Sequence, residues 1–308
     1  IQDVRQTGAT DIVSALHHLP NGAVWSIAEI KQRQHEVEWD EQNHEATNLT
    51  WSIVESVPVH EDIKKQTGNY REYIRNYQQT LRNLAECGIK IVIYNFMPII
   101  DWTRTDLAYR LPNGVRALRF DYFEFAAFDL YILQRRAAEL DYTTQEQIQA
   151  RKVFDAMDET TRQRLIRNIT AGLPGAEESF TLEEFNAALE EYREINAERL
   201  RSHLFAFLRE IMPVADECGV RVAIHPDDPP RPMFGLPRIL SNEQDISLLM
   251  NNFSSPNCGL NICAGSLGAS EANDLEKFIR TWGARIPFVH LRSVQREADG
   301  SFYEAEHI

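Results

Sequence analysis

The sequence has few cysteines, a deficit of basic residues and no long apolar run. Four cysteines in 308 residues are too few for a disulfide scaffold, so we expect a reducing cytoplasm. Against 46 acidic residues there are only 32 lysines and arginines, and the net charge of −14 argues against nucleic acid and anionic membranes as partners. No stretch approaches the roughly 18 apolar residues of a membrane span. The first residues show no basic region followed by an apolar core, so no signal peptide is visible.

A short internal repeat predicts the fold. Residues 86–94 and 217–225 both read Glu-Cys-Gly followed by a β-branched run. Each glycine can stop a helix in the left-handed conformation before a buried strand begins. This joint is typical of a repeating βα architecture with a parallel sheet, whose strands are near-continuous apolar runs. The predicted strands are 12–16, 51–57, 90–96, 221–225, 260–263 and 287–291.

Helical patterns lie between these strands. Asn69 with Glu72 and Thr181 with Glu184 have the spacing of N-terminal capping pairs. Residues 121–213 are helical in pattern throughout, which predicts a helical insertion after the third strand, and the polar residues 32–48 predict a smaller surface insertion. A TIM (β/α)8 barrel has eight strands. We therefore expect residues 1–308 to form a single barrel domain that is a fragment without its last two βα units.

Three predicted strands end in metal-binding side chains. His225, Cys263 and His290 stand at these ends, 38 and 27 residues apart, and each interval is about one βα unit. Side chains at the carboxyl ends of barrel strands converge on one site. Two imidazoles and a thiolate suit a transition metal, and three ligands with an open position are typical of a catalytic centre. The alternative to metal binding is that each histidine is a hydrogen-bonded core residue and that Cys263 is a small buried apolar residue.

Further polar residues lie near the strand ends. Asp227 and Asp228 follow the first ligand and either support a ligand histidine or form a turn. Arginines in the loops at the strand ends can bind a substrate carboxylate with two hydrogen bonds. The alternative is a solvated arginine on the surface, and the sequence favours this alternative more strongly for Arg238 than for Arg292. The candidates for contact with the substrate or for acid–base chemistry are His17, His18, Asn95, Asp227, Arg231, Ser266 and Arg292, with Glu55 and His60 as weaker ones.

Several longer strings resemble mannonate dehydratases. The strings that carry this resemblance are ALHHLPNG (15–22), WSIVESVPVHEDIK (51–64), YNFMPIIDWTRTDL (94–107), NITAGLPGAEE (168–178), HPDDPPRP (225–232), CAGS (263–266) and HLRS (290–293). The resemblance covers the whole chain except the region around 32–48. It implies a xylose-isomerase-like TIM barrel that uses Mn²⁺ or Fe²⁺ to convert D-mannonate to 2-dehydro-3-deoxy-D-gluconate in hexuronate breakdown.

The same resemblance implies roles for individual residues. A His, a Cys and a second His bind the metal in that family, and they match His225, Cys263 and His290. The fourth family ligand is an Asp of an Arg-Pro-Asp-His-Gly motif that this chain does not contain. In the implied reaction a base removes the C2 proton and an acid assists loss of the C3 hydroxyl as water. We assign Arg292 and one of His17 and His18 to the substrate, with His18 and Arg292 as the catalytic candidates.

Two other functions stay open from the sequence. A metal-dependent sugar isomerase or epimerase could use the same barrel, and a closed structural zinc site would make the chain non-enzymatic. The partner we expect is a small sugar acid, and we expect the chain to form a homo-oligomer.

Overall fold

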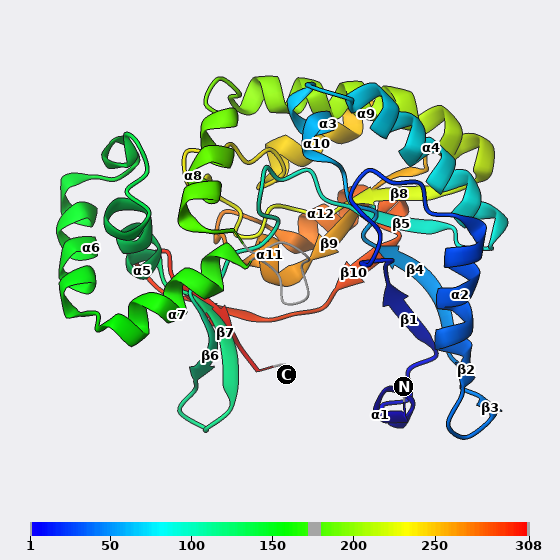
Figure 1. Ribbon diagram of the computed structural model, residues 1–308, viewed down its shortest axis with the longest axis horizontal. Coiled ribbons are helices and arrows are strands. Elements are labelled where there is room, and N and C mark those ends of the chain that lie inside the picture. Colours follow the sequence, from blue (N-terminus) through cyan, green and yellow to red (C-terminus); the bar gives the residue numbers. More distant parts are fainter. Residues whose placement is uncertain (1, 172–179, 307–308) are drawn as a thin grey trace.

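A six-stranded parallel sheet forms the centre of the structure. The computed structural model describes residues 2–171 and 180–306 (Figure 1). The strands lie in the order β1 (Asp11–Ser14), β4 (Thr50–Glu55), β5 (Ile91–Tyr94), β8 (Arg221–Ile224), β9 (Cys258–Cys263) and β10 (Phe288–His290). All neighbours in this order pair in parallel, so each of the six predicted strands is confirmed.

The sheet is curled, so that strands far apart in its order approach each other across the concave face. Glu55 of β4 and His290 of β10 lie 2.8 Å apart, although three strands separate β4 from β10. Val54, Val92 and Val222 occupy the middle of their strands and are fully buried, as expected for strands covered on both faces. The architecture is therefore a parallel half-barrel with helices around it.

The outer face of the sheet is covered by helices, as Figure 1 shows. They are α2 (Ile27–Glu38), α3 (Glu61–Lys65), α4 (Tyr70–Glu86), α9 (Ala197–Cys218), α10 (Glu243–Asn252) and α12 (Leu275–Trp282), with the short α11 (Ala264–Gly268) after β9. Gly88 and Gly219 follow α4 and α9 with φ of 86° and 64°, which confirms the predicted left-handed stops. Gly283 is different, because it is right-handed at φ −49° and begins a short 3₁₀ helix. Asn69 is the N-terminal cap residue of α4, as predicted, but its side chain makes no capping hydrogen bond.

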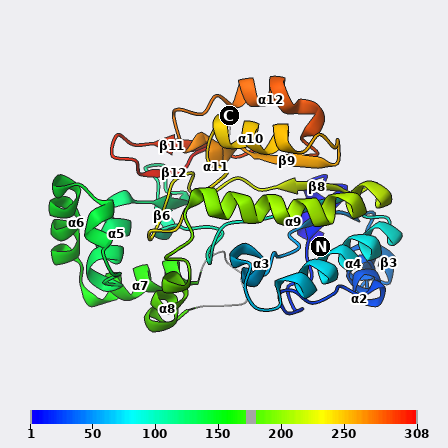
Figure 2. The same ribbon diagram turned by 90° about the horizontal axis from the view of Figure 1, so that it is seen from above.

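A helical group stands to one side of the sheet (Figure 2). It contains α5 (Tyr122–Ala127), the π-helical η1 (Phe128–Ile132), η2 (Ala138–Asp141), α6 (Thr144–Ala156), α7 (Glu159–Thr170) and α8 (Leu182–Glu191). Thr181 and Glu184 form the predicted capping box at the start of α8. The helical segment does not end at residue 213 as predicted, because α9 runs through Pro213 to Cys218 and packs on β8, α3 and α4. Residues 172–178 of the string 168–178 lie outside the described residues.

A second sheet was not predicted. It is antiparallel in the order β11 (Val294–Arg296), β12 (Phe302–Glu304), β7 (Arg116–Phe120) and β6 (Asp106–Arg110). Residues 32–48 are the second half of α2 and the small hairpin β2 (Trp39–Asp40) and β3 (Glu45–Ala46), and α1 (Gln2–Gln6) precedes β1. Within the described parts of the chain, no helix is long and apolar enough to cross a membrane.

Candidate metal centre

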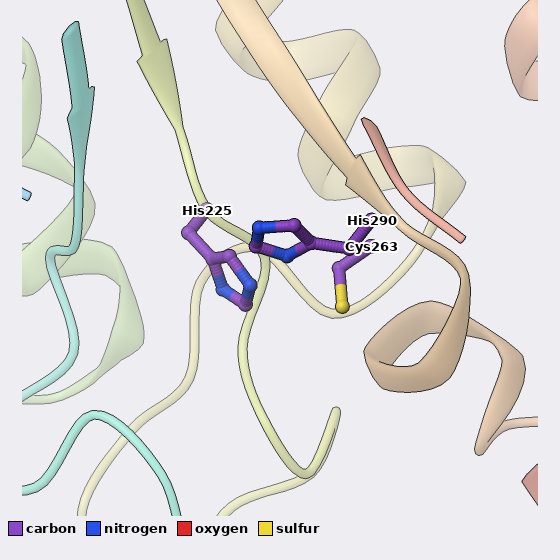
Figure 3. Close-up of side chains that lie close together, drawn as sticks. All are labelled: His225, Cys263 and His290. Carbon is purple, nitrogen blue, oxygen red and sulfur yellow. The ribbon is translucent and has the colours of Figure 1, made fainter. Parts of the chain in front are cut away.

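Three potential ligands meet at the carboxyl edge of the sheet. His225 follows β8, Cys263 ends β9 and His290 ends β10, where it lies opposite Cys263 in the strand register. One nitrogen of each imidazole and the sulfur all lie within 4.8 Å of one another (Figure 3). The structure thus brings the predicted trio together, because parallel strands present their carboxyl ends at the same edge.

Hydrogen bonds fix the orientation of both imidazoles. Nδ1 of His225 donates to the Pro226 carbonyl oxygen at 2.7 Å, which leaves Nε2 as the nitrogen for a metal. Nε2 of His290 donates to a carboxylate oxygen of Glu55 at 2.8 Å, which leaves Nδ1. Metal-binding histidines are held in this way, with one nitrogen bonded to a carbonyl or carboxylate and the other available. Glu55 is therefore a supporting residue of the centre.

The Cys263 thiol is held in its ionised form. Burial alone raises its pKa, but hydrogen bonds with His225 and His290 and the charge of Arg292 outweigh burial and lower the pKa to about 4. For His290, burial lowers the pKa, and the bonds to Cys263 and Glu55 raise it to about 9. A thiolate is the form of cysteine that binds a metal. The donor set of two imidazoles and a thiolate fits a divalent transition metal.

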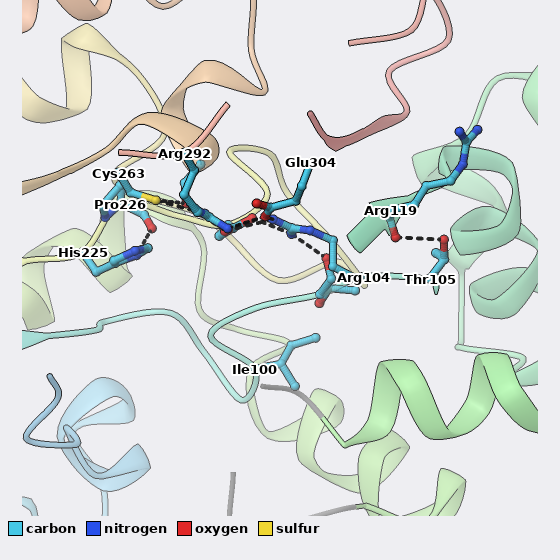
Figure 4. Close-up of polar contacts among 12 residues, drawn as sticks. Ile100, Arg104, Thr105, Arg119, His225, Pro226, Cys263, Arg292 and Glu304 are labelled. Atoms are coloured by element: carbon cyan, nitrogen blue, oxygen red, sulfur yellow. Dashed lines mark hydrogen bonds and ion pairs between the residues drawn. The ribbon is translucent and has the colours of Figure 1, made fainter. Parts of the chain in front are cut away.

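A buried charge network adjoins the cysteine (Figure 4). The Asp228 carboxylate accepts hydrogen bonds from Arg104 at 2.7 and 3.2 Å and from Arg292 at 2.9 Å, and the Ser266 hydroxyl lies 2.8 Å from it. Nη1 of Arg292 also donates to Glu304 at 2.5 Å. Burial raises the pKa of Asp228, but Arg104 and Arg292 hold it well below its usual range. Asp228 is therefore ionised, and its two arginine partners, which also pair with Glu304, join β12 to the strand-end loops around Cys263.

Two predicted substrate residues take part in this network. Nη2 of Arg292 and the hydroxyl of Ser266 each lie 3.0 Å from the Cys263 sulfur. Asp227 lies elsewhere, since its carboxylate accepts from the Leu240 amide and the Ser241 hydroxyl, both at 2.7 Å, and closes its own loop.

A cavity of about 610 Å³ lies beside the trio, over the ends of β1, β4 and β5. The predicted His17 and Asn95 line it, and so does Ser56, the neighbour of Glu55 in the sequence. Among the described residues that line this cavity, none belongs to the trio. Polar residues that the sequence did not single out also line it, namely Glu61, Lys64, Asp101 and Tyr192. These four residues lie beyond the second and third predicted strands and after α8, and no motif in the sequence indicated this role.

The remaining candidates lie outside this cavity. The His18 imidazole pairs with Glu29 at 2.9 Å and is half exposed. His60 caps α3 by accepting from the Asp62 amide, and Arg231 lies over the Tyr122 ring in a separate cavity of about 900 Å³. Arg238 is buried and donates to the Ile100 carbonyl oxygen, so the alternative of a solvated surface arginine is wrong.

The fold and the donor set define an α/β protein with a candidate transition-metal centre at the carboxyl edge of its sheet. Residues 1–308 match the family model for D-mannonate dehydratase (UxuA), including the region 32–48 that we expected to be an insertion. Mannonate dehydratases of Marinomonas sp. (strain MWYL1) and Chromohalobacter salexigens are each 54% identical over 309 residues, which is 100% of this chain and 77% of theirs.

A solved structure agrees with these matches. The crystal structure of mannonate dehydratase from Streptococcus suis serotype 2 is similar with a TM-score of 0.71 and 30% identity, over 97% of this chain and 70% of that chain. The chain belongs to the D-mannonate dehydratase family, and it is therefore an enzyme of the hydro-lyase class.

Proposed function

We propose that the chain binds Mn²⁺ or Fe²⁺ at His225, Cys263 and His290 and dehydrates D-mannonate to 2-dehydro-3-deoxy-D-gluconate in hexuronate breakdown. The observation that carries this proposal is the convergence of three ligand atoms within 4.8 Å in a chain of this family. Thiolate and imidazole donors suit Fe²⁺, and Mn²⁺ is bound by imidazole with oxygen donors.

The chemistry removes the C2 proton and the C3 hydroxyl of the sugar acid. A bound divalent cation supplies the positive charge that stabilises the negative charge developing beside the carboxylate. The loss of water leaves an enol between C2 and C3, which tautomerises to the 2-keto product.

The 610 Å³ cavity supports a substrate site next to the centre. In this proposal His17 and the Asn95 amide, which donates to Asp101 at 3.1 Å, bind hydroxyl groups of the sugar acid. The cavity favours His17 over His18 for contact with the substrate, because only His17 lines it. Asp227 and Arg231 stay predictions as substrate contacts.

An assay with D-mannonate tests the function. The chain is stripped with a chelator, reloaded with Mn²⁺ or Fe²⁺, and the product is detected as a keto-deoxy acid that has lost the mass of water. We expect activity only after reloading and none in Cys263→Ser. A product of unchanged mass would indicate an isomerase or epimerase instead. A Zn²⁺-filled wild type whose Cys263→Ser variant unfolds would indicate a structural site.

Three finer statements belong with this proposal. The curled sheet supports a (β/α)8 barrel of the xylose-isomerase-like kind, and the four free cysteines support a reducing cytoplasmic setting. The homo-oligomer stays a prediction.

A further inference from the structure

We propose that Arg292 and Ser266 are positioning residues that hold the Cys263 sulfur and set its strength as a metal donor. This inference depends on the metal site proposed above. It differs from the sequence prediction, in which both residues contact the substrate. The evidence is the pair of polar contacts to sulfur, from Nη2 of Arg292 and from the Ser266 hydroxyl, each at 3.0 Å.

Both terminal nitrogens of the Arg292 guanidinium are hydrogen-bonded to carboxylates. Nη1 donates to Glu304 at 2.5 Å and Nη2 to Asp228 at 2.9 Å, and the side chain is only 25% exposed. Asp228 is itself fixed by Arg104, which is completely buried. Turning Arg292 toward a substrate would break these contacts inside the protein, so the cation stays beside the sulfur.

The available protons match the acceptors of this cluster. Nη2 of Arg292 has two protons and three acceptors within 3.1 Å, which are Asp228, Cys263 and the Ser266 oxygen. The Ser266 hydroxyl has one proton, to share between Asp228 at 2.8 Å and the sulfur at 3.0 Å. Because Asp228 already accepts from two arginines, the Ser266 proton is free to point at the thiolate.

Gly265 leaves the space that this arrangement needs. A Cβ atom added at Gly265 would lie 2.6 Å from Nε and 2.8 Å from Cζ of Arg292, closer than real contacts allow. Gly265 lies in α11 without the positive φ that would exclude alanine. Alanine at this position therefore displaces the guanidinium while keeping every polar group of the cluster.

Hydrogen bonds to a metal-bound thiolate reduce the electron density that sulfur donates. They lower the energy of the sulfur lone pairs, which raises the energy of sulfur-to-metal charge transfer. The same contacts also orient the sulfur and favour its ionised form, so removal of one lowers metal affinity by about ten- to a hundredfold although the sulfur itself becomes a stronger donor. Both quantities can be measured without turnover.

Co²⁺ binding to the full chain tests the inference through its optical spectrum. We compare wild type, Gly265→Ala and Ser266→Ala, with Ser254→Ala as the control because Ser254 is exposed and precedes β9, whereas Cys263 lies at the other end of that strand. In both test variants we expect the thiolate-to-cobalt band to move to longer wavelength and Co²⁺ affinity to fall by about ten- to a hundredfold. The control should match wild type.

The outcomes separate the two proposals. Wild type that shows no thiolate-to-cobalt band would refute the metal site itself. Suppose that wild type binds Co²⁺ and shows the thiolate-to-cobalt band. If both variants then have the same band position and the same Co²⁺ affinity as wild type, only the positioning role is refuted. Circular dichroism checks folding, and if Gly265→Ala does not fold, the Ser266→Ala spectrum decides alone.

Discussion

The buried pair of Arg104 and Asp228 leads to a quantitative stability prediction. The side chains are 0% and 1% exposed, and their closest contact is 2.7 Å. Asp228→Asn keeps the shape but leaves Arg104 and Arg292 to share the charge of Glu304, which lies 3.7 and 2.5 Å from them. Removing one partner of a buried pair costs roughly 3–5 kcal/mol. With an unfolding entropy of about 2.1 cal/mol/K per residue, this lowers Tm by roughly 5–8 °C.

Thermal melting followed by circular dichroism measures this loss at pH 7. The control is Glu276→Gln, which breaks an ion pair with Arg280 whose side chains are 73% and 76% exposed. Solvent screens such a pair, so we expect Tm to change by about 1 °C or less. Equal melting temperatures for the two variants would refute the reasoning that burial makes Asp228 important.

The same pair has a defined pH dependence. The pKa of Asp228 is lowered from its usual value of 3.8, so folding favours the ionised form. Its contribution to stability is therefore complete above about pH 5 and is lost as pH falls through the folded-state pKa. We expect the Tm difference between wild type and Asp228→Asn to be constant from pH 8 to 5 and to shrink below pH 4. A difference that grows on acidification would contradict this sign.

Three further predictions are independent of the pair. His17→Ala should lower kcat/KM by about tenfold or more through loss of a substrate hydrogen bond, while His18→Ala should stay within about twofold, and steady-state kinetics with D-mannonate compares them. Thr181→Ala should destabilise the chain by about 1 kcal/mol through loss of its capping box, as measured by urea unfolding, and an unchanged midpoint would contradict this. Light scattering should give a multiple of the 35.5 kDa chain mass if it forms a homo-oligomer, and a monomer mass would refute that.

The six parallel strands could be predicted because each is an apolar run with a strong boundary. The Gly88 and Gly219 stops mark where a helix must end, and burial on both faces removes polar residues from the strands that follow. The trio at the strand ends followed from the same regularity, because ligands one βα unit apart meet at one edge.

The supporting residues could not be predicted, because their partners are distant in the sequence. Arg104 pairs with Asp228 124 residues later, and Glu304 reaches Arg292 from a three-residue strand with no apolar pattern. The extent of the helical segment was wrong for a similar reason, since α9 has the same helical pattern as its neighbours. Whether α9 belongs with the helices that cover the sheet depends on the elements that it packs against. The helical periodicity of a sequence does not show this.

The contact between Glu304 and Arg292 has a consequence for the order in which the centre is assembled during synthesis. The strand β12 that carries Glu304 pairs with β7, which leaves the ribosome long before it. Domains generally fold as units, so the centre forms only when all of its parts have been made. His225 and Cys263 emerge from the ribosome before the third ligand and before the arginine that contacts the sulfur, and Glu304, which holds that arginine, emerges last, so the centre is complete only after β12 has been made.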